Sequence, residues 1–170
     1  DLEALARWMD RQGLGKGPLE DAAMLGGGTQ NILLRFTRDG RTYVLRRPPP
    51  YLRKNSNETM RREARMLAAI ADTDVPHPRL IAACPEEDVI GASFYLMEPI
   101  DGFNPTVGLP PLHASDPAIR RRMGFSLVEG IAKLGAVDYE KVGLGDFGKV
   151  DNYLERQVAR WQAQLESYRE

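Results

Sequence analysis

This 170-residue sequence contains one cysteine and two histidines, and its formal net charge is only −1. Its single cysteine, Cys84, excludes an internal disulfide and a cysteine-rich zinc site, which is typical of a reducing cytoplasm. The 23 Lys and Arg nearly balance the 24 Asp and Glu, so charge gives nucleic-acid binding no support. No apolar run approaches the roughly 20 residues of a membrane span, and Asp1-Leu2-Glu3 begins no signal-peptide pattern. We therefore expect a cytoplasmic protein with no nucleic-acid or membrane partner.

The composition is that of a folded protein. Hydrophobic residues make up 42% and charged residues 28% of the chain, which excludes wholesale disorder. The length suffices for one ordinary domain, or for a small lobe and part of another. Neither an internal repeat nor a low-complexity stretch is visible.

The first hundred residues predict a small antiparallel sheet with helices packed on it. Asp39-Gly40 is a hairpin signal between two apolar runs, and Pro48-Pro49-Pro50 ends the second run because proline cannot donate to a strand ladder. The expected elements are, in chain order, a helix at 2–9, strands at 19–25, 31–37 and 42–46, a helix at 57–70, and strands at 79–84 and 89–97.

From residue 103 onward the pattern becomes helical. A Pro- and Gly-rich loop at 103–113 precedes Ser115-Asp116-Pro117, which is a helix N-cap followed by proline at the first helical position. A long apolar stripe follows, and Asp151 is expected to cap a last helix whose apolar side includes Trp161. Trp161 is read as a core residue of that helix, and Trp8 is expected to pack the first helix on the sheet. The fold class predicted is α+β.

Glu63 stands out because a carboxylate lies inside the apolar stripe of its helix, between Met60 and Leu67. A carboxylate that faces a core is costly unless it is paired. Residues 35–65 contain ten Lys and Arg against three Asp and Glu, and Arg46, at the end of a strand, is the natural partner. The alternative, equally open, is that Glu63 lies at the edge of the stripe and reaches water.

The loop Gly26-Gly27-Gly28-Thr29-Gln30 lies between two predicted strands. Glycines let backbone N–H groups approach a phosphate closely, although most such loops are only turns. It is not a Walker P-loop, because that motif needs a Gly-Lys pair followed by Ser or Thr. No Gly-Lys pair of this sequence meets the requirement, since Gly15-Lys16 is followed by Gly17. The order of the features is that of a protein-kinase nucleotide lobe. It consists of a glycine loop, a strand that ends in a basic residue, a helix with an inward Glu and a strand leading to a connector.

An ordered set of motifs spans most of the chain. The motifs are Gly27-Gly28-Thr29-Gln30-Asn31, Tyr43-Val44-Leu45-Arg46-Arg47-Pro48-Pro49, Arg62-Glu63, Val75-Pro76-His77-Pro78, Phe94-Tyr95-Leu96-Met97-Glu98, Asp101-Gly102, Leu134-Gly135-Ala136-Val137-Asp138 and Gly143-Leu144-Gly145-Asp146-Phe147-Gly148. In this order they resemble the aminoglycoside phosphotransferase-like kinases, especially the subgroup related to the phosphotransferase domain attached to some acyl-CoA dehydrogenases. The resemblance implies a protein-kinase-like fold, with a nucleotide lobe at 1–98, a hinge at 99–102 and the first helices of an incomplete helical lobe at 103–170.

The resemblance also implies a function and a set of nucleotide-binding residues. The family transfers the γ-phosphate of ATP to a hydroxyl group of a small molecule with Mg²⁺. The implied residues are Gly26, Gly27, Gly28, Thr29 and Gln30 over the phosphates, Arg46 on phosphate oxygens with Glu63 as its partner, Val44 and Met97 as apolar walls, and Glu98 to Ile100 at the hinge, where backbone groups bond adenine.

The catalytic groups of such kinases are missing from this sequence. The family needs a catalytic Asp in a loop resembling His-Gly-Asp, a nearby Asn and a later Asp for Mg²⁺, but His77 and His113 lie in no such motif and are read as ordinary loop residues. Asp146-Phe147-Gly148 spells a kinase metal motif, yet no catalytic loop precedes it. We expect a truncated kinase whose catalytic residues and metal ligands lie in a missing C-terminal half. The alternatives are a non-catalytic nucleotide-binding or interaction module and a plain α+β domain whose glycine loop is only a turn.

The 170 residues by themselves are predicted to have little or no kinase activity, because they lack the base and the metal ligands that phosphoryl transfer needs. A coupled assay of ATP turnover measures this directly. Robust turnover that is lost on Arg46→Ala would contradict the prediction.

Overall fold

The computed structural model describes residues 1–26 and 31–169 of the chain. The chain forms two compact units, Asp1–Val137 and Asp138–Glu170, and each has its own structure. The predicted α+β class is confirmed by an antiparallel sheet and its helices in the first unit. The division into a lobe at 1–98, a hinge at 99–102 and a helical part at 103–170 stays a prediction.

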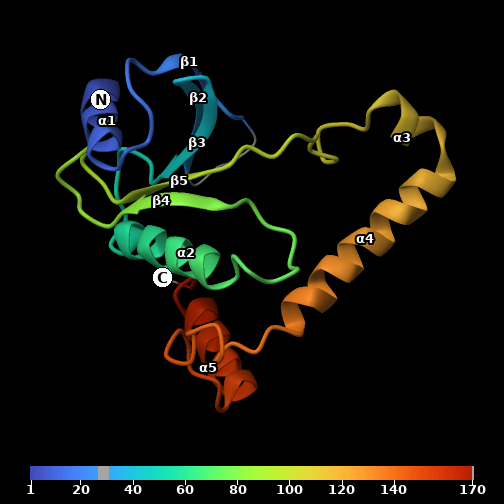
Figure 1. Ribbon diagram of the computed structural model, residues 1–170. Helices are drawn as coiled ribbons and strands as arrows, with labels where there is room; N and C mark the ends of the chain where they lie inside the picture. Colours follow the sequence, from blue (N-terminus) through green and yellow to red (C-terminus); the bar gives the residue numbers. More distant parts are fainter. Residues whose placement is uncertain (27–30, 170) are drawn as a thin grey trace. The chain divides into compact units, whose positions relative to one another are not determined.

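The first unit is built on a five-stranded antiparallel sheet with the order β1-β2-β3-β5-β4 (Figure 1). Its β2–β3 hairpin turns at Asp39 and Gly40, whose φ angles of 50° and 74° are the two left-handed conformations of the type I′ turn that Asp-Gly favours. The strands are β1 (Glu20–Met24), β2 (Ile32–Arg38), β3 (Arg41–Arg47), β4 (Leu80–Cys84) and β5 (Phe94–Met97).

Helix α1 (Leu2–Arg11) covers one face of this sheet. The Trp8 ring meets the Phe94 ring edge to face at a centroid distance of 4.8 Å, as the sequence predicted for the first helix. The Phe36 and Tyr43 rings stack beside them across the β2–β3 pair. The core on this face consists of Leu5, Trp8, Met9, Phe36, Tyr43, Leu45, Cys84, Phe94 and Leu96.

Arg38, at the end of β2, fastens α1 to the sheet. Its side chain is 1% exposed and donates hydrogen bonds to the Ala6 carbonyl at 2.9 Å and to the Gly17 carbonyl at 3.1 Å. A third bond goes to the Asp10 carboxylate. A buried guanidinium is tolerated here because its donors are satisfied, two of them by backbone carbonyls.

Helix α2 (Ser56–Ala69) packs on the opposite face of the sheet (Figure 1). Its buried stripe of Met60, Ala64 and Leu67 contacts Tyr95 of β5, with Leu80 and Met97 at the margin of the cluster. The spacing of these three positions, at i, i+4 and i+7, is the helical spacing that the sequence indicated. The sheet is thus the middle layer between two helices.

The helices of the C-terminal part are α3 (Pro111–Ser115), α4 (Pro117–Gly135) and, in the second unit, α5 (Tyr153–Glu166). Asp116 caps α4, since its carboxylate accepts a hydrogen bond from the Ala118 N–H at 2.7 Å, as predicted. The α4 stripe at Leu127, Val128, Ile131 and Leu134 is more than half exposed, so it adds nothing to the core of the described residues. Among the helices described, no span is long and apolar enough to cross a membrane.

Four local predictions were wrong. The strand expected at 89–97 begins only at Phe94, because Gly91 takes a left-handed φ of 77° and the residues before it form a turn. The short helix α3 occupies the C-terminal end of the predicted loop, so His113 is helical. The N-cap of α5 is Asn152, with φ 51°, rather than Asp151, and Trp161 is 63% exposed rather than part of a core.

Arg38→Met is expected to lower the free energy of unfolding of the first unit by about 2 kcal/mol, since three acceptors lose their donor and a buried group is replaced. Urea unfolding followed by Trp8 fluorescence in a Trp161→Phe background measures this change. Arg35→Met, at an exposed position of the same strand, is the control and should shift stability by less than about 0.5 kcal/mol. Equal effects of the two substitutions would contradict the prediction.

Candidate functional site

The register of the sheet gathers the predicted site residues on its α2 face. Val44 of β3 lies opposite Met97 of β5, and Arg46 lies opposite Tyr95. Alternate residues of a strand share a face, so Val44 and Arg46 point to the same side as Tyr95 and Met97. This side is the one covered by α2, from which Glu63 comes.

Arg46 and Glu63 form the ion pair that the sequence suggested. The Arg46 Nε atom is 2.9 Å from Glu63 Oε2, and Arg46 Nη2 donates to Glu63 Oε1 at 3.2 Å. Two guanidinium nitrogens thus lie close to two carboxylate oxygens, and the contact made by Nη2 is a charge-assisted hydrogen bond. The two side chains are 30% and 25% exposed, so the pair is screened less than a surface pair.

Tyr95 completes this site, and sequence reasoning missed it. Its hydroxyl donates a hydrogen bond to Glu63 Oε2 at 3.1 Å, while the ring is 3% exposed. Burial raises the pKa of the Tyr95 hydroxyl, with the Glu63 carboxylate acting in the same direction and Arg46 against it. The one available signal was the register, because Tyr95 can be placed opposite Arg46 only when β5 is paired with β3.

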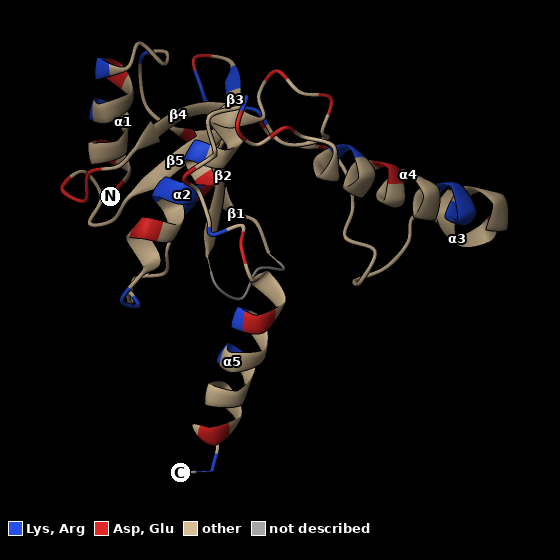
Figure 2. Cartoon of the chain, turned by 90° about the horizontal axis from the view of Figure 1, so that it is seen from below, with Lys and Arg blue, Asp and Glu red and all other residues tan. Residues whose placement is uncertain are grey.

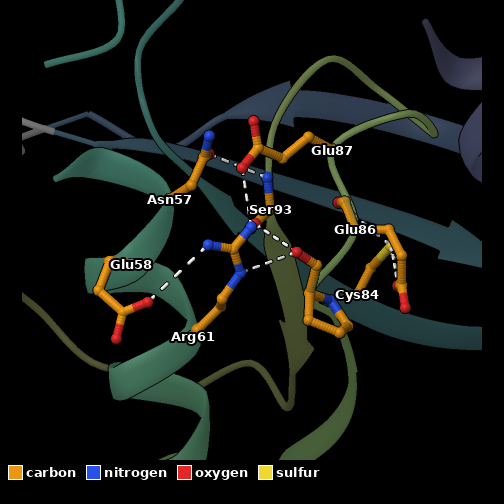
Figure 3. A network of polar contacts seen from close by, with 8 residues as sticks. Asn57, Glu58, Arg61, Cys84, Glu86, Glu87 and Ser93 are labelled. Atoms are coloured by element: carbon orange, nitrogen blue, oxygen red, sulfur yellow. Dashed lines mark hydrogen bonds and ion pairs between the residues drawn. The ribbon is translucent and has the colours of Figure 1, made fainter. Parts of the chain in front are cut away.

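A second polar network holds α2 against the β4–β5 turn (Figure 3). Arg61 of α2 donates to the Pro85 carbonyl at 2.9 Å and to the Glu87 carboxylate at 2.7 Å. The Asn57 side chain accepts the Ser93 N–H at 3.1 Å, so Asn57 fastens the start of the helix rather than capping it. These bonds tie two turns of α2 to the sheet, and they fix the helix that carries Glu63.

The cluster of basic residues at 35–65 is largely committed to structural partners. Arg38 is bound on the α1 face, and Arg47 donates to the carbonyls of Pro48 at 3.1 Å and Ile90 at 3.2 Å, while burial lowers its pKa. Figure 2 shows basic and acidic positions alternating along α2 and its neighbours. The net count of the sequence therefore overstates the charge that an anion would meet.

The predicted hinge residues lie where β5 ends. The Glu98 N–H donates to the Arg79 carbonyl at 2.9 Å, and the Glu98 carboxylate is 3.4 Å from Arg41 Nη2. Pro99 has no N–H, which leaves Ile100, 69% exposed, as the next backbone donor along the chain. Val44 is 3% exposed, so little of its surface is accessible in this structure.

Two further predictions concern the glycine loop at residues 26–30 and the ligands of Mg²⁺. Gly26 is exposed, whereas Gly27, Gly28, Thr29 and Gln30 lie outside the described residues. Within residues 1–26 and 31–169 the structure contains no group of three His, Cys, Asp or Glu side chains that could hold a metal ion.

Comparison with protein families agrees with this geometry. A family model described as the phosphotransferase enzyme family matches residues 22–170, which is most of the chain. The chain belongs to this family. A crystal structure from Ralstonia eutropha, described as a "putative aminoglycoside phosphotransferase", superimposes with a TM-score of 0.77 at 35% identity, over 98% of this chain and 47% of that one. The predicted kinase-like fold is thereby confirmed.

Curated relatives are far longer proteins. Acyl-CoA dehydrogenase family member 10 of Mus musculus is 30% identical over 148 residues, which are 87% of this chain and 14% of that protein. "Probable acyl-CoA dehydrogenase IBR3" of Arabidopsis thaliana is 33% identical over 121 residues, 70% of this chain and 14% of that protein. The chain thus corresponds to about one seventh of each, and the resemblance to a domain attached to acyl-CoA dehydrogenases is confirmed.

Cys84, beside the network that holds α2, is expected to react slowly with alkylating agents. Burial, followed by its hydrogen bond to Glu86, raises the pKa of this thiol to about 11 (Figure 3). Two pH units correspond to a roughly hundredfold smaller thiolate fraction at pH 8. Iodoacetamide should modify the native chain at least about a hundredfold more slowly than the urea-unfolded chain.

Glu86→Gln is the informative variant for this prediction. It removes the carboxylate that opposes ionisation, so the pKa of Cys84 falls and alkylation becomes faster, although burial still limits the rate. A cysteine at an exposed position, Ser167→Cys in a Cys84→Ser chain, serves as the unprotected reference. Equal rates for Cys84 in the native and unfolded chains would show that the thiol is neither buried nor raised in pKa.

Proposed function

We propose that this chain is the nucleotide-binding part of an ATP-dependent small-molecule kinase, which transfers the γ-phosphate of ATP to a hydroxyl group. The observation that carries the proposal is the close Arg46–Glu63 ion pair on one face of an antiparallel sheet, in a member of a phosphotransferase family. A half-buried charge pair adds little net stability to a fold, because the cost of desolvating the two charges offsets their attraction. A charge pair at this place is better suited to position the Arg46 guanidinium so that it can bind an anionic ligand.

Arg46 would bind phosphate oxygens, and Glu63 would hold its guanidinium in position. Arginine offers a planar fork of donors that matches phosphate geometry, and its charge does not depend on pH in the physiological range. Since Glu63 engages one edge of that fork through Nε and Nη2, it fixes the plane of the group. A preorganised cation favours negative charge on the phosphates without reorganising during the reaction.

The adenine ring would lie against the end of β5. There the Glu98 N–H already donates a hydrogen bond to the Arg79 carbonyl. The backbone groups that would bond adenine are therefore the Glu98 carbonyl and the Ile100 N–H. Met97, half-buried at the end of the strand, would form an apolar wall, together with Val44 once the side chains around it move apart. The loop Gly26-Gly27-Gly28-Thr29-Gln30 would cover the phosphates.

Mg²⁺ and the catalytic Asp are expected from residues beyond these 170, since the sequence has no His-Gly-Asp motif and the described part has no cluster of metal ligands. The metal would neutralise charge on the phosphates. The acceptor remains a hydroxyl-bearing small molecule, with antibiotics, choline-like compounds, sugars and hydroxyacyl-CoA thioesters as the open classes. We place the protein in the cytoplasm on the evidence of its single thiol.

A non-catalytic nucleotide-binding module is the second candidate, because no His-Gly-Asp motif stands in these 170 residues. An assay of the longest protein that the gene encodes decides between the kinase and the module. ATP turnover with any of the four acceptor classes supports the kinase, whereas ATP binding without turnover supports the module.

Isothermal titration of the chain with ATP tests the proposal. Arg46→Ala should weaken ATP binding by roughly tenfold or more, since a charge-assisted contact to phosphate is lost. Glu63→Gln should weaken it less, because the cation stays but is no longer held. Arg7→Ala, on the exposed side of α1, is the control. An ATP affinity that is the same in all four proteins would contradict the proposal.

A further inference from the structure

We propose that Tyr95 is a positioning residue of this site, whose hydroxyl holds the Glu63 carboxylate in the orientation that presents Arg46 to phosphate. The inference rests on the proposed function, which it deepens. It starts from a convergence at one atom, Glu63 Oε2, which is 2.9 Å from Arg46 Nε and accepts the Tyr95 hydroxyl at 3.1 Å.

The geometry leaves the carboxylate little freedom. Arg46 and Tyr95 are cross-strand partners in β3 and β5, so their side chains lie next to one another on the same face of the sheet. Glu63 contacts both of them from α2, which packs on that face. A carboxylate that only paired with arginine could rotate about the side-chain bonds of both residues. The third contact comes from a rigid ring fixed in the core by Met60 and Leu67, so it removes this rotation.

The Tyr95 hydroxyl is suited to this task because it stays protonated. Burial is the main cause that raises its pKa, so it remains a donor throughout the pH range in which kinases are assayed. Its ring and its hydroxyl also have separable functions: the ring packs in the α2 cluster, while the hydroxyl alone reaches Glu63. Tyr95→Phe therefore removes the positioning group and leaves the packing in place.

Isothermal titration with two probes distinguishes positioning from structure. In Tyr95→Phe the affinity for ATP should fall by roughly three- to tenfold, whereas the affinity for adenosine, which has no phosphate, should stay within about twofold. Tyr43→Phe is the matched control, since Tyr43 is equally buried on the opposite face of the sheet and is 2% exposed. Equal losses for ATP and adenosine would reduce Tyr95 to a packing residue and overturn the proposal.

A double-mutant cycle tests whether Tyr95 acts through Glu63. In a Glu63→Gln background, Tyr95→Phe should change ATP affinity by less than about twofold, because the carboxylate that it orients is gone. A full three- to tenfold loss in that background, roughly as in the single variant, would overturn the proposed route.

Nuclear magnetic resonance separates this inference from the proposed function. The Arg46 Nε–Hε signal, assigned by its loss in Arg46→Lys, should exchange with water roughly three- to tenfold faster in Tyr95→Phe than in the wild type or in Tyr43→Phe. An unchanged rate would overturn the positioning role. Failure of the wild-type chain to bind ATP would instead overturn the proposed function and the part of the inference that concerns phosphate, and the exchange rates would still decide whether Tyr95 orders the pair.

Discussion

The pairing of Arg46 on a central strand with Glu63 on α2 is the constraint that fixes the geometry of the site. A charge on the inner side of a helix is costly unless a partner is fixed opposite to it. The sheet must therefore present Arg46 in the right register, and α2 must lie at one depth and one rotation. The cross-strand position of Tyr95 and the bonds from Arg61 to the β4–β5 turn meet these two requirements. The geometry of the site is thus a consequence of how firmly the helix is held.

The same arrangement explains how the basic residues are used. A count along the chain suggests one strongly positive segment, but the two faces of the sheet divide it. Arg38 binds carbonyl groups and Asp10 under α1, and Arg47 binds the carbonyls of the chain nearby. Arg46 differs because its partner is a carboxylate that is itself positioned by a second donor. A guanidinium held in this way can serve a ligand, whereas one enclosed by carbonyls serves the fold.

Membership of the phosphotransferase enzyme family and the acyl-CoA dehydrogenase relatives bear on different levels of the function. The family and the kinase-like fold describe the chain at the level of a phosphotransferase. The relatives are far longer proteins, of which this chain matches a small share. The apolar stripe of α4, exposed at Leu127, Val128, Ile131 and Leu134, contributes no buried residue to the core of the described chain.

Most of the elements, the Asp39-Gly40 hairpin, the cap at Asp116 and the family could be predicted from the sequence, because turn chemistry, helical periodicity and ordered motifs are local properties of the chain. The sequence also offered the pairing of Arg46 with Glu63, but only as one of two readings, since periodicity cannot tell the edge of a stripe from its centre. Tertiary structure decided between them, and it alone placed Tyr95 beside the pair and Arg38 on the other side of the sheet. The reason is physical: which side of a strand a residue faces, and what lies across from it, follows from pairing with segments distant in the sequence.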